Sequence, residues 1–297
     1  MTTREKPLVL VTGTSSGIGF ELIKKLYSGG RYRVVATTRE QSIPKILKRG
    51  LQEKEGFWLR PLDVTSYIQR LRLVQEIDAS WGGVDILVNN AGISYRAVVE
   101  HMSDEEEFHQ MDTNYLGAMS LVRLVLPGMR KKCRGQIINV SSVSGMMAMP
   151  TMSSYTASKF ALEGATEALW YELKPWNIKV SLIQPGFIRS ESFKNIYYSK
   201  KSGECRIDSR DPYCQYYADM SPFVEKLMSW SFTSAENVAS RILLTMKKSN
   251  PPLRIPATLD AYIFFWLRRL LPRWLYHRVL YHGLPGVKKW SKLNGCK

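Results

Sequence analysis

The segment Tyr155–Phe160, YTASKF, places a phenol and a primary amine four residues apart, at Tyr155 and Lys159. Side chains at this spacing share one face of a helix, so the two groups would lie close together. A cation beside a phenol favours the phenolate and lowers the phenol pKa, so that the group can exchange protons near neutral pH. Exposed helix pairs without a chemical role often show the same spacing, so the interpretation depends on the rest of the chain.

Two further positions carry groups that suit catalysis. Ser141 and Ser142 end the apolar run GQIINVSS, and Asn114 lies within a helical pattern, MDTNYLG. A serine hydroxyl can stabilise charge that develops on a substrate oxygen. Asparagine is unfavourable inside a helix and could divert a backbone carbonyl towards water. Each residue also has a plain alternative, because strand-end serines often bond backbone and Asn114 could simply be exposed.

Six short apolar runs are the elements expected to position these groups, at residues 8–13, 32–38, 57–63, 84–92, 135–142 and 178–186. A helix-sized segment follows each run; the first is Ile18–Tyr27, which Gly29 and Gly30 end. Near-continuous apolar strands that alternate with helices predict a parallel sheet covered on both faces. We therefore predict a single α/β domain over residues 5–255, a doubly wound parallel sheet of the Rossmann type. Ligands would bind beyond the carboxyl ends of its strands.

The first run leads into TGTSSGIG, Thr12–Gly19, between a predicted strand and a predicted helix. Glycine tolerates positive φ and lets the backbone approach a pyrophosphate, and the helix that follows directs its free N–H groups at that anion. Although an ordinary glycine-rich loop could look the same, the strand and helix on either side are the context that a nucleotide site requires. The predicted contacts are Gly13, Ser15, Ser16, Gly17, Ile18 and Gly19.

The end of the second strand indicates which nucleotide binds. An acidic residue there would hold the ribose hydroxyls of NAD, whereas this chain has two threonines and then Arg39. A guanidinium suits a 2′-phosphate, and Ser16 could add a hydroxyl, so NADP(H) is favoured. Glu40 is an opposing signal. Asp63, at the end of the third strand, could accept a bond from the adenine amino group or cap the next helix.

Taken together, Asn114, Ser142, Tyr155 and Lys159, with TGTSSGIG and NNAG at 89–92, resemble the short-chain dehydrogenase/reductase family over about residues 5–250. The spacing to Tyr155 matches the family for Ser142 rather than Ser141. The resemblance implies that Tyr155 is the general acid or base, assisted by Ser142, and that Lys159 also bonds the nicotinamide ribose. Asn114 would help to hold a water that links Lys159 to solvent. Further implied cofactor contacts are Asp63, Val64, Asn90, Ala91, Gly92, Tyr155, Lys159, Pro185, Gly186, Ile188 and Ser190.

Within the family, TGTSSGIG, VVATTRE, YTASKFALEG and PPLRIP look most like the 17β-hydroxysteroid and retinol dehydrogenase branch. The branch acts on bulky lipophilic alcohols and ketones, so a steroid- or retinoid-like substrate is expected. Residues 190–232 would form the substrate-binding loop region. Its aromatic residues, and the methionines after Ser142, could line the pocket or pack in the core or a dimer. The candidate substrate contacts are Met147, Met149, Phe193 and Tyr197.

Residues 256–297 form a basic, aromatic C-terminal extension, and from Ala261 onward it has no Asp or Glu. The extension could lie on anionic lipid as an interfacial helix, or pack across the substrate loop, or do both. Pro272 would start a new helix or kink one. The chain shows neither a signal peptide nor a membrane-spanning stretch, and its cysteines read as free thiols of a reducing compartment. We expect a cytoplasmic protein, with peripheral membrane contact as an option.

The net charge of +16 suggests anionic partners. One alternative is a reductase of a 3-oxoacyl thioester on an acidic carrier; another is a regulatory protein that binds NADP(H) without turnover. Nucleic-acid binding is not predicted, because the basic tail lacks a recognition module. The family resemblance implies a homodimer or a tetramer. No metal is implied, since the four histidines, at 101, 109, 277 and 282, show no ligand spacing.

Overall fold

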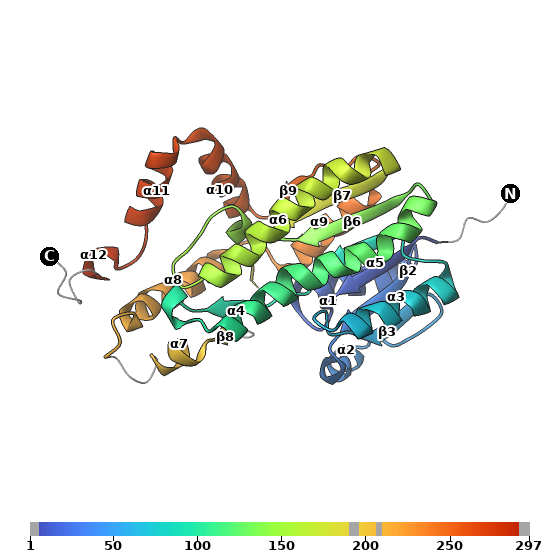
Figure 1. Cartoon of the computed structure of the whole chain (residues 1–297), viewed down its shortest axis with the longest axis horizontal. Coiled ribbons are helices and arrows are strands. Elements are labelled where there is room, and N and C mark those ends of the chain that lie inside the picture. Colours follow the sequence, from blue (N-terminus) through green and yellow to red (C-terminus); the bar gives the residue numbers. More distant parts are fainter. Residues whose placement is uncertain (1–5, 190–195, 206–209, 291–297) are drawn as a thin grey trace.

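A parallel sheet of seven strands, in the order β3-β2-β1-β4-β6-β7-β9, forms the centre of the protein (Figure 1). The computed structural model describes residues 6–189, 196–205 and 210–290. The strands are β1 (Leu8–Thr12), β2 (Arg33–Thr38), β3 (Phe57–Pro61), β4 (Ile86–Asn89), β6 (Gly135–Val140), β7 (Ile178–Gln184) and β9 (Arg254–Pro256). All six predicted strands are present. Of the seven strands in this sheet, the edge strand β9 is the one that was not predicted.

A second layer of structure lies beyond the carboxyl edge of the sheet. β5 (Tyr95–Arg96) pairs in parallel with β8 (Tyr197–Tyr198), so that Arg96 lies opposite Tyr198. The short helix α7 (Lys200–Glu204) and the long helix α8 (Cys214–Trp230) follow β8. The sequence patterns predicted neither β5 nor β8, because a pair of two-residue strands has no periodic signal.

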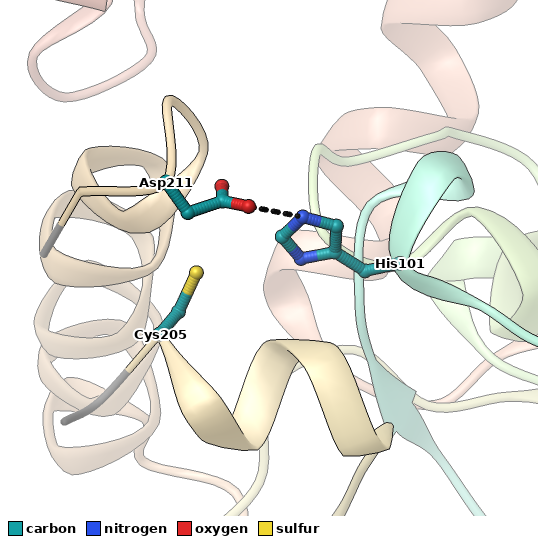
Figure 2. Close-up of side chains that lie close together, drawn as sticks. All are labelled: His101, Cys205 and Asp211. Carbon is teal, nitrogen blue, oxygen red and sulfur yellow. Dashed lines mark hydrogen bonds and ion pairs between the residues drawn. The ribbon is translucent and has the colours of Figure 1, made fainter. Parts of the chain in front are cut away.

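A buried histidine joins this layer to the main domain (Figure 2). His101 lies in the 3₁₀ turn η2 (Val99–His101), and its Nε2 is 3.2 Å from Oδ2 of Asp211. The Tyr217 hydroxyl lies 2.9 Å from the other ring nitrogen and accepts a hydrogen bond from the Val98 N–H. Cys205 completes the group, and its sulfur lies within 4.8 Å of the nearest donor atoms of His101 and Asp211. These contacts fix the start of α8 against the segment that follows β5.

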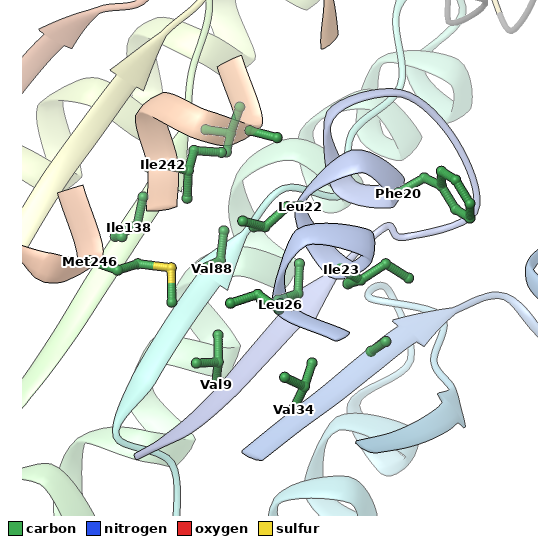
Figure 3. Packing of buried hydrophobic residues seen from close by; sticks show 14 of the residues in the cluster. Val9, Phe20, Leu22, Ile23, Leu26, Val34, Val88, Ile138, Ile242 and Met246 are labelled. Atoms are coloured by element: carbon green, nitrogen blue, oxygen red, sulfur yellow. The ribbon is translucent and has the colours of Figure 1, made fainter. Parts of the chain in front are cut away.

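Helices cover both faces of the sheet, and successive residues of β1 point to opposite sides. On one side Val9 and Val11 pack against α1 (Gly17–Gly29), α2 (Ile43–Leu47) and α9 (Ala235–Lys247). Figure 3 shows this cluster, in which Leu22, Ile23 and Leu26 of α1 meet Val34, Val88, Ile242 and Met246. On the other side Leu8 and Leu10 meet α3 (Tyr67–Trp81), α5 (Gly117–Lys131) and α6 (Ser153–Leu173). Gly30 ends α1 in the left-handed conformation, with φ of 59°, as expected.

The helix that carries Asn114 is irregular. α4 (Asp104–Met111) begins at a capping box formed by Ser103 and Glu106. It continues through a π-helical turn, η3 (Asp112–Leu116), into α5. Three short 3₁₀ turns complete the main domain: η1 (Glu40–Ser42), η4 (Val143–Gly145) and η5 (Lys174–Trp176).

The C-terminal extension forms α10 (Leu259–Leu270), α11 (Arg273–His282) and α12 (Val287–Trp290), and α11 begins directly after Pro272. Trp290 returns to α8, where it stacks on Tyr216 at 4.1 Å and donates to Asp219 at 2.8 Å. The extension therefore packs over the substrate side, which was one of the two expectations. Among the described residues, no helix combines the length and the apolar character needed to cross a membrane.

Candidate active site

A cavity of about 660 Å³ opens along the carboxyl edge of the sheet, from the glycine-rich loop at one end to α6 and α8 at the other. Nearly all the predicted site residues that the structure describes line it. The exceptions are Gly19, Asn114 and Met147. Ser190 and Phe193 lie outside the described residues.

Glycine is required where the backbone closes on the cavity. Gly13 has φ of 70°, and a Cβ atom there would lie 2.6 Å from the Cα of Ala91. Gly17, with φ of 56°, begins α1. Gly19 does not line the cavity, because it packs behind the loop against Gly13 and Asn90. The loop ends at the N-terminus of α1, where main-chain N–H groups without partners inside the helix fit a pyrophosphate.

Asn90 fastens the glycine-rich loop to the end of β4. Its amide nitrogen donates to the carbonyls of Thr12 and Gly13, both at 2.9 Å. The Thr12 hydroxyl accepts bonds from the backbone N–H groups of Asn90 and Ala91, both at 3.0 Å. Although Asn90 lines the cavity, its side chain is used to hold the loop in place.

Two cations and several hydroxyls line the adenosine end. Arg39 is exposed and begins η1, and Lys45 of α2 lies on the same wall with Ser42. Glu40, the opposing signal in the sequence, is not among the lining residues. Lys45 was not predicted as a cofactor contact, because α2 is a single short turn with no distinctive sequence pattern. Asp63 lines the cavity too, and its Oδ1 accepts bonds from the Thr65 backbone and hydroxyl. It does not cap α3, whose N-cap is Ser66.

Lys159 and Tyr155 meet at the other end of the cavity. Lys159 is buried and donates to the Val140 carbonyl at 3.0 Å, and its Nζ lies 5.8 Å from the centre of the Tyr155 ring. Burial lowers the pKa of Lys159 to about 8, opposed by the charge of Glu163. The two groups therefore lie on one helix face, as their spacing predicted.

The prediction that Lys159 lowers the Tyr155 pKa is wrong for this structure, in which the pKa of Tyr155 is raised. Burial is the largest effect on the Tyr155 phenol and raises its pKa. A hydrogen bond with Ser142 and the positive charge of Arg96 lower that pKa, and Lys159 is not among the causes. Arg96 is therefore an electrostatic partner of Tyr155 that the sequence analysis missed.

The two adjacent serines have different partners. Ser142 bonds the Tyr155 phenol and accepts from the Ser144 N–H at 3.1 Å. Ser141 donates instead to Glu163 at 2.9 Å, and Glu163 also accepts from Gln184 at 2.8 Å. Burial raises the pKa of Glu163. Both serines line the cavity, but only Ser142 is paired with the phenol of Tyr155.

The Asn114 side chain is buried outside the cavity. Its Oδ1 accepts from the Ile93 N–H at 2.8 Å, while its Nδ2 donates to the Ile93 carbonyl and the Ser158 hydroxyl, both at 3.0 Å. The amide thus joins the segment after β4 to α6. Asn114 is therefore buried, which excludes the plain alternative of an exposed residue, and it lies in the π turn η3.

The loop after β7, which carries Pro185, Gly186 and Ile188, is held by the C-terminal extension. Thr258 accepts from the Gly186 N–H at 2.9 Å, and Asp260 accepts from the Phe187 N–H at 2.8 Å. Both acceptors lie at the start of α10, where Thr258 also caps the helix. The extension therefore supports the cavity wall directly.

The substrate end of the cavity is mostly apolar, with Met149 and Tyr197 on its wall as predicted. Met147 is a correction, because the turn η4 directs it into the hydrophobic cluster beneath α8 and α12. Other lining residues that were not predicted are Arg96, Met152, Phe187, Val224 and Met228.

Comparisons with known proteins agree with this geometry. The profile of the short chain dehydrogenase family matches residues 7–201. The chain is 33% identical to 3-ketodihydrosphingosine reductase of Bacteroides thetaiotaomicron, over 83% of this chain and 86% of the relative. It is 35% identical to human retinol dehydrogenase 8, over 83% and 79% of the two chains.

Solved structures show the same fold. A short-chain dehydrogenase from Streptomyces avermitilis superposes with a TM-score of 0.75 and 26% identity, covering 97% of this chain and 98% of that one. ElxO with NADP bound superposes with a TM-score of 0.66 and 25% identity, covering 85% and 97%. The chain belongs to the short-chain dehydrogenase family. It is an NAD(P)-dependent oxidoreductase.

Proposed function

We propose that this oxidoreductase uses NADP(H) to interconvert a lipophilic alcohol, steroid- or retinoid-like, with its ketone or aldehyde. The observation that carries the proposal is one continuous cavity with Ser142, Tyr155 and Lys159 at its apolar end and Arg39 and Lys45 at the other. Two relatives, named for retinol and for 3-ketodihydrosphingosine, support a lipid-like substrate.

In the proposed mechanism a bound nicotinamide supplies or accepts the hydride. Tyr155 donates its phenolic proton to the substrate oxygen during reduction and takes a proton back during oxidation. Ser142 hydrogen-bonds the same oxygen and stabilises the charge that develops there. Lys159 holds the nicotinamide ribose. Asn114 supports the site through Ile93 and Ser158, and the π turn around it is the proposed place of a water that links Lys159 to solvent.

The preference for NADP(H) rests on the adenosine end. A guanidinium and an ammonium, with the hydroxyls of Ser16 and Ser42, are suited to a 2′-phosphate. Among the described residues that line the cavity, no carboxylate lies at the end of β2, where NAD-binding sites hold the ribose hydroxyls.

The C-terminal extension is a candidate contact for an anionic membrane. Its helices expose apolar side chains beside arginines, among them Ile263, Trp266, Leu270 and Trp274. Truncation after Pro256 would also remove Thr258 and Asp260, so point variants are the better test. We expect Trp266→Ser with Trp274→Ser to reduce flotation with anionic vesicles, whereas Tyr171→Ser, an exposed aromatic on α6, leaves it unchanged. Unchanged flotation of the double variant contradicts this role.

The family resemblance supports a homodimer or tetramer, which sedimentation at several protein concentrations would test. A purely monomeric protein that retains full activity contradicts this expectation.

The function is tested by following the consumption of NADPH and NADH with a steroid ketone, retinal, 3-ketodihydrosphingosine and a 3-oxoacyl thioester. Tyr155→Phe serves as the catalytic control. Turnover of a lipophilic carbonyl with NADPH supports the proposal. If the thioester is the one carbonyl that is reduced, the proposed substrate class is wrong but the proposed mechanism still holds. Tight NADPH binding without turnover of any carbonyl favours the regulatory alternative.

A further inference from the structure

Arg96 is a cation at the substrate end of the cavity. It lies on β5, where backbone pairing with β8 places it opposite Tyr198. Its side chain is half-buried and lines the same cavity as Ser142, Tyr155 and Met149. The positive charge of Arg96 lowers the pKa of the Tyr155 phenol, the group that would face the substrate oxygen.

No anionic side chain within the described ranges neutralises this guanidinium. None of the hydrogen bonds or ion pairs among the described residues involves Arg96, and the titratable groups that act on its pKa are the phenols of Tyr155 and Tyr198, which are neutral at pH 7. Among the described residues that line the cavity, Asp63 is the only acidic one, and it lies at the adenosine end, bound to Thr65. A half-buried cation without a counter-ion is costly, because it gives up hydration without an ionic partner.

Part of the wall around Arg96 is apolar, although polar side chains such as Ser94 and His109 also line this end. Met149, Met152, Val224 and Met228 line this end, and methionine adapts to irregular apolar shapes. Lys159 is a second cation at this end, but it donates to the Val140 carbonyl. Arg96 therefore offers a positive charge beside apolar side chains that suit a hydrocarbon. Arginine also presents a planar fork that matches the paired oxygens of a carboxylate or phosphate.

We propose that Arg96 binds an acidic group of the substrate, so that the substrate is an apolar carbonyl compound or alcohol with a carboxylate or phosphate near its reacting carbon. This inference rests on the proposed function and narrows its substrate class. Arg96 would hold the anion while Ser142 and Tyr155 hold the oxygen, and the two contacts together would orient the carbonyl carbon. A substrate with an ammonium group at that place would be repelled.

The test compares substrates that share the carbonyl and the hydrocarbon chain but differ in the acidic group: a medium-chain γ-oxo acid, its uncharged methyl ester, and the keto phosphate of similar length. With NADPH, we expect the wild type to prefer at least one anion over the ester by about 10- to 100-fold in kcat/KM, as charge-assisted hydrogen bonds of this kind provide. Whether carboxylate or phosphate is preferred identifies the acidic group. Arg96→Leu should bring the ratio of anion to ester close to one, and Arg96→Lys should keep part of the preference.

Lys45→Leu is the matched control, because it removes a cation from the far end of the same cavity. It should leave the ratio of anion to ester unchanged. Thermal unfolding of each variant checks that the fold survives. A ratio that is the same in Arg96→Leu and the wild type overturns the proposal, and this is also the result expected if a carboxylate of the protein pairs with Arg96.

A binding measurement separates this inference from the proposed function. Tyr155→Phe with NADPH bound needs no turnover, so quenching of NADPH fluorescence by the oxo acid, the keto phosphate and the ester can be compared directly. A preference for an anion that disappears in Tyr155→Phe with Arg96→Leu supports the anion site even if no ketone is reduced. Equal binding of the anions and the ester in Tyr155→Phe overturns it.

Discussion

The two ends of the cavity differ in whether backbone or side chains form their walls. The adenosine and pyrophosphate end is mainly backbone, shaped by Gly13 and Gly17 and fastened by Asn90. The substrate end is made of side chains from distant segments, such as Arg96, Met149 and Val224. A backbone site accepts few substitutions without losing its shape. A side-chain site can change its substrate while the fold stays intact, so the same fold can serve many substrates.

The largest expected effect is that of Tyr155→Phe, which should impair the function of the substrate end and leave the cofactor end unchanged. It removes the proton donor but leaves the glycine-rich loop untouched, so we expect turnover to fall by about 1,000-fold while NADPH affinity stays near that of the wild type. Steady-state NADPH consumption and a fluorescence titration measure the two quantities. A variant that keeps most of its turnover would remove Tyr155 from the mechanism.

The converse change acts on the adenosine end. Arg39→Gln with Lys45→Gln should weaken NADPH binding by about 10- to 100-fold, because charged hydrogen bonds to the 2′-phosphate are lost. NADH binding and kcat should change little. Lys48→Gln, at the end of α2 and away from the cavity wall, is the control. If the double variant loses affinity for NADPH and for NADH equally, these cations do not bind the 2′-phosphate.

The third prediction concerns Lys159, whose buried ammonium should lower the stability of the folded protein. Its pKa in the folded protein is about 8, whereas the ordinary pKa of a lysine is 10.5, so the unfolded chain binds more protons between these values. The buried ammonium therefore lowers stability below about pH 8, and the penalty disappears as the pH rises towards 10.5. Lys159→Met should be more stable than the wild type at pH 7 by about 1–3 kcal/mol, although inactive.

Chemical unfolding at several pH values measures this difference, which should shrink towards pH 10. A variant that is less stable than the wild type at pH 7 would show that the bond from Lys159 to the Val140 carbonyl outweighs the cost of burial.

The smallest expected effect concerns the wall that joins the two ends. Asp260→Ala leaves the Phe187 N–H without its acceptor, so we expect a loss of about 1–2 kcal/mol in stability and a several-fold rise in KM. Asp219→Ala is the control, because it removes the hydrogen bond from Trp290 of α12 to α8 without touching the loop after β7. Equal effects on KM from both variants would mean that the extension acts through its overall packing.

The sequence predicted what local patterns encode. The six strands have continuous apolar runs, the glycine-rich loop has its strand and helix, and the i, i+4 spacing of Tyr155 and Lys159 survives in α6. The roles of Lys45 and Arg96 depend instead on which distant segments meet, and no periodicity records that. Met147 was placed wrongly because the 3₁₀ turn η4 changes the direction of the chain directly after Ser142.

The bonds from Thr258 and Asp260 to the loop after β7 have a consequence for biosynthesis. α10 comes after all seven strands of the main sheet, so a ribosome releases these two acceptors only when the rest of the catalytic domain has already emerged. Until then Gly186 and Phe187 lack their partners, and the wall beside the reacting groups is incomplete. A nascent or prematurely terminated chain would carry the catalytic tyrosine without a finished site around it, so activity reports on completed chains.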